Sequence, residues 1–159
     1  MAPELWEFGE LGETELQAFA ARLAGAMRWP LVIYLEGDLG AGKTTLCRAL
    51  IRALGHEGSV KSPTYGLMEH YSLGHYSALH LDLYRIGAPG EVEFLGISDL
   101  MDDSTLLLVE WPERGAGALI PADIVISLDH AEDRRRLNAR SMSDLGHSTL
   151  QDITDKSSS

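Results

Sequence analysis

The sequence predicts an α/β fold, a three-layer sandwich with a central, mostly parallel β-sheet and an antiparallel C-terminal hairpin. An apolar run over residues 31–36 is followed by a glycine-rich stretch and then by helical spacing over 44–54. Two further apolar runs, at 78–82 and 105–110, each end in an acidic residue. Such runs are typical of buried strands that finish at the ligand-binding edge of an open α/β sheet.

The N-terminal part is expected to form an edge strand over residues 5–11 and then a helix. Thr14 and Gln17 have the spacing of a capping box, and apolar residues recur on one helical face as far as residue 27. Pro30 closes this segment, so the strand at 31–36 follows it directly.

Beyond the second helix, the pattern indicates a strand-like stretch that ends at Tyr71 and a turn at 72–74. A short helical piece is expected at 91–95, where Pro and Gly precede it and Gly follows it. Residues 124–129 alternate as in a half-buried strand, and 137–142 are expected to return beside them as the hairpin partner.

The chain of 159 residues is long enough for one domain with a real core and too short for two. We expect residues 1–142 to form that single domain. Residues 143–159 are mostly Ser, Asp and Thr, a composition that favours a disordered tail.

Composition excludes several classes of function. The formal net charge is −11, from 13 basic and 24 acidic residues, so tight independent binding to nucleic acid is not expected. The arginine run at 134–136 is expected to be a solvated strand end or turn. No apolar run approaches the length of a membrane span, and the acidic N-terminus does not resemble a secretory signal. With Cys47 as the single cysteine, these features favour a cytoplasmic protein without an internal disulfide.

One string in the sequence predicts a phosphate-binding loop, because it reads G-x-x-x-x-G-K-T between a strand and a helix. Its glycines bring peptide N–H groups close to phosphate oxygens, and the helix directs its positive end at the same anion. The lysine supplies a mobile charge for the terminal phosphates, and the threonine hydroxyl can ligate Mg²⁺. The expected nucleotide-binding residues are Gly37, Asp38, Leu39, Gly40, Ala41, Gly42, Lys43, Thr44 and Thr45.

Two acids are candidates to face this loop. Asp82 and Glu110 end the runs at 78–82 and 105–110, where a magnesium–triphosphate site needs carboxylates. One is expected to hold the metal and the other to orient or activate the attacking water, and the sequence leaves the division of roles open. The expected catalytic residues are therefore Lys43, Asp82 and Glu110. His80 shares a strand face with Asp82 and is expected to be packed or hydrogen-bonded.

The absence of two motifs argues against two classes of nucleotide-binding protein, the GTPases and the ABC-type ATPases. The sequence has no Asn-Lys-x-Asp guanine reader and no Ser-Gly-Gly-Gln signature of ABC-type ATPases. A stand-alone small-molecule kinase remains an alternative, because a few arginines are available for a lid. A nucleotide-gated binding module, in which hydrolysis is incidental, is a second alternative.

Five strings together resemble the TsaE (YjeE) family of small bacterial ATPases that act in tRNA threonylcarbamoyladenosine synthesis. The resemblance extends over most of the predicted domain, and the Ser-Pro-Thr-Tyr and Glu-Trp-Pro strings are its most specific parts. The strings lie at residues 36–45, 60–65, 80–85, 93–97 and 109–114.

The resemblance implies a P-loop NTPase fold that binds ATP and Mg²⁺. It implies that Thr44 and Glu110 hold the metal and that Asp82 lies beside the metal and the attacking water. A switch loop near the γ-phosphate is implied at residues 62–65. Further nucleotide contacts are implied at Thr14, Ser62 and Thr64.

The resemblance also implies protein partners, TsaD and TsaB, on whose assembly the chain would dock. ATP hydrolysis would reset that assembly between modification cycles, the threonylcarbamoyl transfer would belong to TsaD, and tRNA would be met only through the complex. The sequence departs from the family pattern at Gly66, where a hydroxyl residue is common, and in the serine-rich end.

Overall fold

The computed structural model describes residues 3–60 and 67–157. Within these ranges, no helix has both the length and the apolar content that crossing a bilayer requires. The elements, in chain order, are β1 (Glu4–Leu11), α1 (Glu13–Gly25), β2 (Leu31–Glu36), α2 (Lys43–Ala53), β3 (Met68–Leu73), β4 (Tyr76–Asp82), the 3-10 helix η1 (Pro89–Leu95), α3 (Ile97–Leu100), β5 (Thr105–Glu110), the 3-10 helix η2 (Pro112–Gly115), β6 (Ile124–Ala131), β7 (Arg134–Ser141) and α4 (Asp144–Ser157).

The strands form one sheet in the order β1-β7-β6-β2-β5-β4-β3, which confirms the mixed α/β class. Its four central strands, β6, β2, β5 and β4, run parallel. Both edges are antiparallel, because residues 74–75 and 132–133 are connections too short for a parallel crossover. The expected C-terminal hairpin is therefore confirmed as β6–β7, and β1 pairs with β7 as an edge strand. The central sheet is mostly parallel, as expected, and its antiparallel pairs at the two edges make the sheet as a whole mixed.

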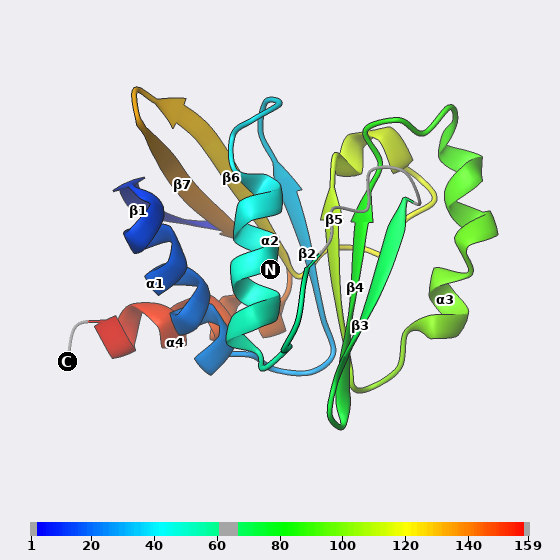
Figure 1. The fold of residues 1–159 in the computed structure, drawn as a ribbon, viewed down its shortest axis with the longest axis horizontal. Helices are drawn as coiled ribbons and strands as arrows, with labels where there is room; N and C mark the ends of the chain where they lie inside the picture. The colour runs from blue at the N-terminus through cyan, green and yellow to red at the C-terminus, as the bar shows by residue number, and fades with distance from the viewer. Residues whose placement is uncertain (1–2, 61–66, 158–159) are drawn as a thin grey trace.

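Both faces of the sheet are covered (Figure 1). Helices α1, α2 and α4 lie on one side, and η1 and α3 lie on the other. In β2, Leu31, Ile33 and Leu35 belong to the hydrophobic cluster beneath α1 and α2, whereas Val32 belongs to the opposite cluster. This alternation buries the central strands on both faces, which explains why they appear in the sequence as continuous apolar runs.

The start of α1 differs from the expected capping box. The residue before the helix is Gly12, whose N–H donates to the carboxylate Oε2 of Glu15 at 3.0 Å. Thr14 lies exposed within the first turn and does not cap the helix. The glutamate three residues after Gly12 was the informative signal, and glycine is itself an acceptable N-cap.

The C-terminal segment corrects the expectation of a disordered tail over 143–159. Helix α4 occupies most of it and contacts α1 and β7. Its apolar residues Leu150 and Ile153 are fully buried. Ser143 precedes the helix, accepts a hydrogen bond from the Gly146 N–H at 3.0 Å and donates to Asp123 Oδ1 at 2.7 Å. The domain thus extends through α4, because a few apolar residues at helical spacing suffice when a tertiary surface receives them.

We expect Ile153→Ala to lower the free energy of unfolding by about 2–5 kcal/mol, the usual cost of emptying a fully buried aliphatic site. Urea denaturation followed by circular dichroism measures this value. The control is Gln151→Ala on the exposed face of the same helix, which should cost less than about 0.5 kcal/mol. Equal effects of the two substitutions would show that α4 does not contribute to the core.

Candidate functional site

The glycine-rich loop spans residues 37–42, between the end of β2 and the start of α2. Gly37 has φ +148°, and a Cβ at this position would lie 2.3 Å from the Leu128 carbonyl oxygen. Gly42 has φ +100° and directly precedes α2. At Gly37 only glycine fits, because any Cβ would collide with the Leu128 carbonyl of β6, and both positive φ angles favour glycine. The loop can therefore turn tightly against the sheet and present its backbone at the N-terminus of α2.

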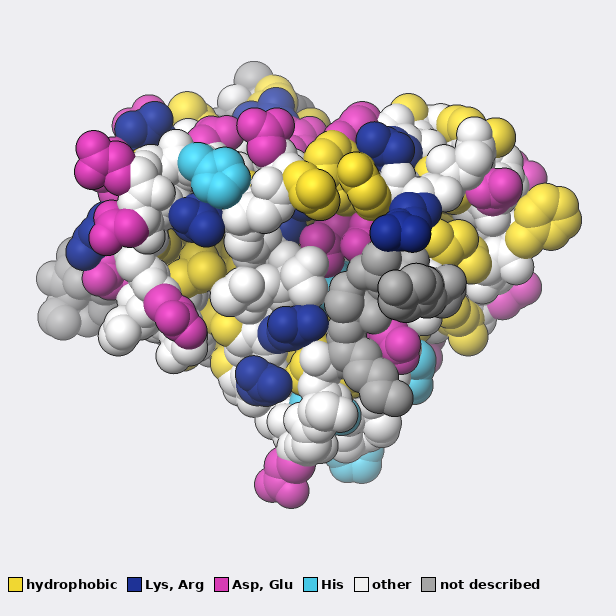
Figure 2. All heavy atoms as spheres, turned by 45° about the horizontal axis from the view of Figure 1, so that its top comes forward, with side chains coloured by type: hydrophobic (Ala, Val, Ile, Leu, Met, Phe, Trp, Pro, Cys, Tyr) yellow, Lys and Arg dark blue, Asp and Glu magenta, His cyan; other side chains and the backbone are white. Residues whose placement is uncertain are grey.

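The loop forms one wall of a cleft of about 380 Å³ at the carboxyl edge of the parallel strands. Residues 39–45 line it together with the expected acids Asp82 and Glu110. Figure 2 looks onto this edge and shows acidic side chains recessed near the middle of the face, beside hydrophobic and basic ones. The structure thus brings the predicted loop and the predicted acids together.

Lys43 is only 4% exposed and folds back onto its own loop. Its Nζ donates hydrogen bonds to the carbonyl oxygens of Gly37 and Asp38, the latter at 3.1 Å. The ammonium also lies 4.1 Å from the centre of the Trp111 ring. Burial lowers the pKa of Lys43, and the carboxylates of Glu110 and Glu113 oppose that shift. The cation therefore rests on neutral acceptors inside the cleft.

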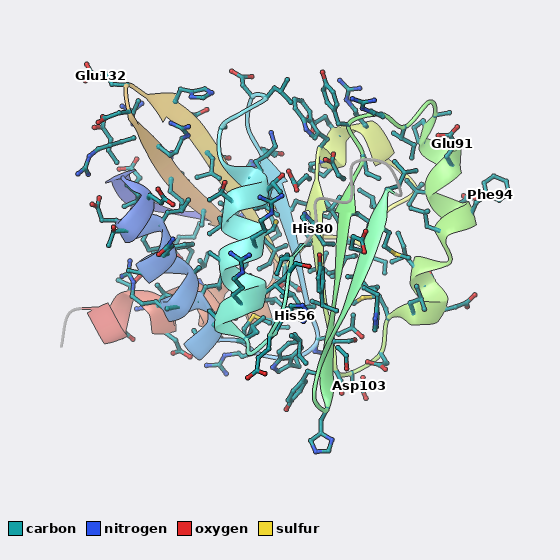
Figure 3. The ribbon with its side chains drawn as sticks, viewed as in Figure 1. His56, His80, Glu91, Phe94, Asp103 and Glu132 are labelled. Carbon is teal, nitrogen blue, oxygen red and sulfur yellow. The ribbon has the colours of Figure 1, made fainter. Side chains whose placement is uncertain are left out.

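Glu110, at the end of β5, is 2% exposed and is held by two donors. The Thr44 hydroxyl donates to its Oε1 at 2.8 Å and lies 3.0 Å from Oε2. The His80 Nε2 lies 2.6 Å from Oε2. This hydrogen bond confirms the expectation for His80, which Figure 3 labels beside β4.

Strand register explains how the acids meet the loop. β4 and β5 are parallel, with Asp82 beside Glu110 and His80 beside Leu108. Because side chains alternate, these residues share the face covered by α2, while Leu81 and Val109 point to the opposite cluster. Asp82 is 8% exposed, and its Oδ1 accepts the Tyr84 N–H at 3.0 Å. Burial raises the pKa of Asp82, and Glu110 raises it further.

The oxygen atoms of Thr44 and Glu110 fit a magnesium site. Mg²⁺ prefers a few hard oxygen ligands, and here a hydroxyl and a carboxylate meet at the helix N-terminus inside the cleft. Cys47 and His80 also lie close to Glu110, and the potential ligand atoms of the three residues lie within 4.8 Å of one another. The thiol is fully buried and burial raises its pKa, so it packs in the core as a neutral group.

One expected contact outside the glycine-rich loop is not placed in the cleft. Thr14 does not line it in the described structure, although a neighbouring cavity of about 330 Å³ is lined by the adjacent residues Gly12 and Glu13. That cavity and the cleft share Gly42, Thr45 and Arg135. The other expected contacts, Ser62 and Thr64, lie outside the described residues.

Sequence reasoning missed Arg135, which it assigned to a solvated strand end. The structure places it in the lining of the cleft, where Nη2 lies 3.3 Å from the Gly40 carbonyl oxygen. No local signal distinguishes Arg135 from its neighbours in the arginine run. Tyr84 and Trp111 also line the cleft as an aromatic pair with centroids 5.0 Å apart.

The fold and the site together define a mixed α/β protein with a glycine-rich loop facing buried carboxylates at the carboxyl edge of its sheet. The crystal structure of YdiB from Bacillus subtilis has the same fold, with a TM-score of 0.83 over 99% of both chains at 22% identity. The family model "Threonylcarbamoyl adenosine biosynthesis protein TsaE" matches residues 12–138. The chain belongs to the TsaE family.

Relatives named tRNA threonylcarbamoyladenosine biosynthesis protein TsaE support this membership. The protein of Haemophilus influenzae is 43% identical over 120 residues, which cover 76% of each chain. The protein of Aquifex aeolicus is 33% identical over 126 residues, covering 78% of this chain and 86% of that protein. The resemblance inferred from the five sequence strings is thereby confirmed.

Asp82→Asn should stabilise the chain near neutral pH in buffer without divalent cations. Because folding raises the pKa of Asp82, the contribution of this residue to the free energy of unfolding is most favourable below the unfolded pKa of about 3.9. That contribution is lost as pH rises through the folded pKa. Asparagine keeps an acceptor for the Tyr84 N–H and removes the buried charge. The variant should therefore have a higher Tm than wild type near neutral pH, and the difference should disappear in acid.

The control for this measurement is Asp103→Asn, at an exposed acid before β5. Scanning calorimetry across a pH series gives Tm for all three proteins. If Asp82→Asn melted at or below the wild-type temperature near neutral pH, the assignment of a costly buried carboxylate would be wrong.

Proposed function

We propose that this chain is a P-loop ATPase that requires Mg²⁺ and acts in threonylcarbamoyladenosine modification of tRNA. Membership of the TsaE family supports the role in this biosynthesis. The observation that carries the proposed activity is the contact of Thr44 with Glu110 at 2.8 Å, directly after the glycine-rich loop. That contact brings a hydroxyl and a carboxylate together where a helix N-terminus favours an anion.

In this proposal, loop amides and the N-terminus of α2 bind the β- and γ-phosphates of ATP. Lys43 exchanges its carbonyl acceptors for phosphate oxygens, a favourable exchange because a buried cation gains an anionic partner. Thr44 and Glu110 hold Mg²⁺, which supplies positive charge that stabilises the phosphoryl oxygens. Asp82 lies on the neighbouring strand and is assigned to the attacking water.

The neighbouring cavity supports a ligand as large as a nucleoside triphosphate, because it continues from the cleft past Gly42 and Thr45. The cleft suits the phosphates, and the cavity between α1 and the β6–β7 hairpin provides room for the nucleoside. Arg135 lines both and is placed to contact an anion at their junction.

We further propose that the chain docks on TsaD and TsaB and that hydrolysis resets their assembly between cycles. The net charge of −11 supports contact with tRNA only through that complex, because a strongly acidic chain repels a phosphate backbone. In this arrangement the chain hydrolyses ATP but does not itself transfer the threonylcarbamoyl group.

Thr44→Ala should raise the Mg²⁺ concentration that half-saturates ATP hydrolysis by at least about tenfold, a loss that even an outer-shell partner of a metal typically causes. Steady-state phosphate release over a Mg²⁺ titration measures it. Thr44→Ser keeps the hydroxyl and should remain close to wild type. Unchanged Mg²⁺ dependence in Thr44→Ala would refute the metal assignment.

A reconstitution tests the whole proposal. Purified chain, TsaD, TsaB, tRNA, ATP and a threonylcarbamoyl donor are combined, and modified nucleoside is counted per ATP consumed. We expect repeated modification cycles with the wild-type chain and at most a single round with Glu110→Ala, because that variant lacks the carboxylate that holds the metal. Multiple rounds with a Glu110→Ala chain that binds but does not hydrolyse ATP would instead identify a nucleotide-gated binding module.

A further inference from the structure

His80 is the one imidazole in the described residues that is buried completely, with 0% exposure on β4. Its neighbours on β4, Leu79 and Leu81, are equally buried and belong to the opposite hydrophobic cluster. A strand residue under α2 needs no polar atom to pack against a helix, and an imidazole there costs desolvation. The hydrogen bond at 2.6 Å to Glu110 is therefore the physical reason for a histidine at this position.

The bond has a defined direction. A carboxylate carries only acceptors, so Nε2 of His80 donates the proton to Oε2 of Glu110. The other ring nitrogen, Nδ1, is buried and has no partner among the described residues. A proton on Nδ1 would bury an unpaired donor, so hydrogen bonding favours the tautomer that carries its proton on Nε2.

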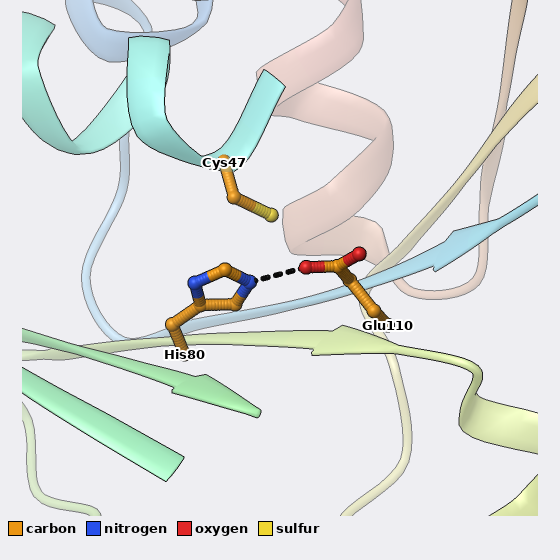
Figure 4. A group of neighbouring side chains, drawn as sticks. All are labelled: Cys47, His80 and Glu110. Carbon is orange, nitrogen blue, oxygen red and sulfur yellow. Dashed lines mark hydrogen bonds and ion pairs between the residues drawn. The ribbon is translucent and has the colours of Figure 1, made fainter. Parts of the chain in front are cut away.

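His80 and Thr44 hold Glu110 from two sides. The hydroxyl of Thr44 is nearer to Oε1, at 2.8 Å against 3.0 Å to Oε2, whereas His80 contacts Oε2 alone. Cys47 covers the pair from α2, with its Sγ within 4.8 Å of the ligand atoms of both residues (Figure 4). Loss of the His80 donor would leave Oε2 with only the hydroxyl that Thr44 shares between both oxygens, and would free the side chain to turn toward water.

We propose that His80 is a positioning residue for the proposed Mg²⁺-dependent reaction, fixing Glu110 so that its carboxylate faces Thr44 and the cleft. The inference rests on the proposed function, since it assigns a role in that same site. His80 contacts neither the cleft nor a substrate, because it is absent from the cleft lining and fully buried. Its effect therefore passes through Glu110 alone.

The test compares two amides that differ only in reach. His80→Gln can place an amide N–H near the Nε2 position, whereas His80→Asn is one methylene shorter and cannot. His80→Leu removes the donor without leaving an unpaired amide, and it serves where the asparagine variant folds poorly. Leu79→Ala, on the opposite face of the same strand, is the control for loss of stability alone.

Two quantities are measured for each variant. The first is the Mg²⁺ concentration that half-saturates the binding of a non-hydrolysable ATP analogue, followed by calorimetry. The second is the split between kcat and KM for ATP hydrolysis at saturating Mg²⁺. We expect His80→Asn and His80→Leu to raise the Mg²⁺ requirement and lower kcat by about 10–100-fold, the range typical of outer-shell partners, with KM nearly unchanged. His80→Gln should recover most of both.

The outcomes separate this inference from the proposed function. A wild-type chain whose analogue binding ignores Mg²⁺ overturns both. With normal wild-type behaviour, three results overturn the inference alone: wild-type Mg²⁺ dependence in His80→Leu, a His80→Gln variant as impaired as His80→Asn, or an equal loss in Leu79→Ala. Recovery by glutamine together with a normal Leu79→Ala establishes the role of the donated N–H.

Discussion

The site depends on burying the carboxylate of Glu110 beside a glycine-rich loop. Removing a carboxylate from water carries a penalty of several kcal/mol unless hydrogen bonds replace the lost hydration. Here Thr44 and His80 supply those bonds at 2.8 and 2.6 Å. Asp82 lies on the adjacent strand, and its raised pKa shows that the local environment resists a second buried negative charge. A bound cation would relieve that resistance, which is the electrostatic logic of a metal site at this position.

Sheet order makes this meeting possible. β2 carries the loop and lies between β5 and β6, so the end of β5 stands directly beside the start of the loop. The chain leaves β2 toward α2 on one face, and after β4 it passes to η1 and α3 on the other face (Figure 1). Connections that diverge to opposite faces leave a crevice at the carboxyl edge of a parallel sheet, and the cleft lies there.

The sequence predicted the parts of this site that are specified locally. The loop, Asp82 and Glu110 could be found because each follows an apolar run whose end marks the sheet edge. Arg135 could not be found, because its position follows from the pairing of β7 with β6 and from a hairpin that folds back over the loop. Helix α4 was missed because its polar composition outweighs its two buried apolar residues, Leu150 and Ile153, which become buried only when α4 contacts α1 and β7 in the folded chain. The donor role of His80 required the register with β5.

The arginine run at the start of β7 shows how an acidic chain can still receive a small polyanion. Arg134 pairs with Glu15 at 2.7 Å and Arg136 pairs with Glu10 at 3.1 Å, so both face the acids of α1 and β1. Strand alternation turns Arg135 the other way, toward the Gly40 carbonyl and the cleft. Two of the three cations are thus neutralised on the surface, where a long phosphate backbone would meet them. The third lines the cleft instead, where only a ligand small enough to enter would meet it.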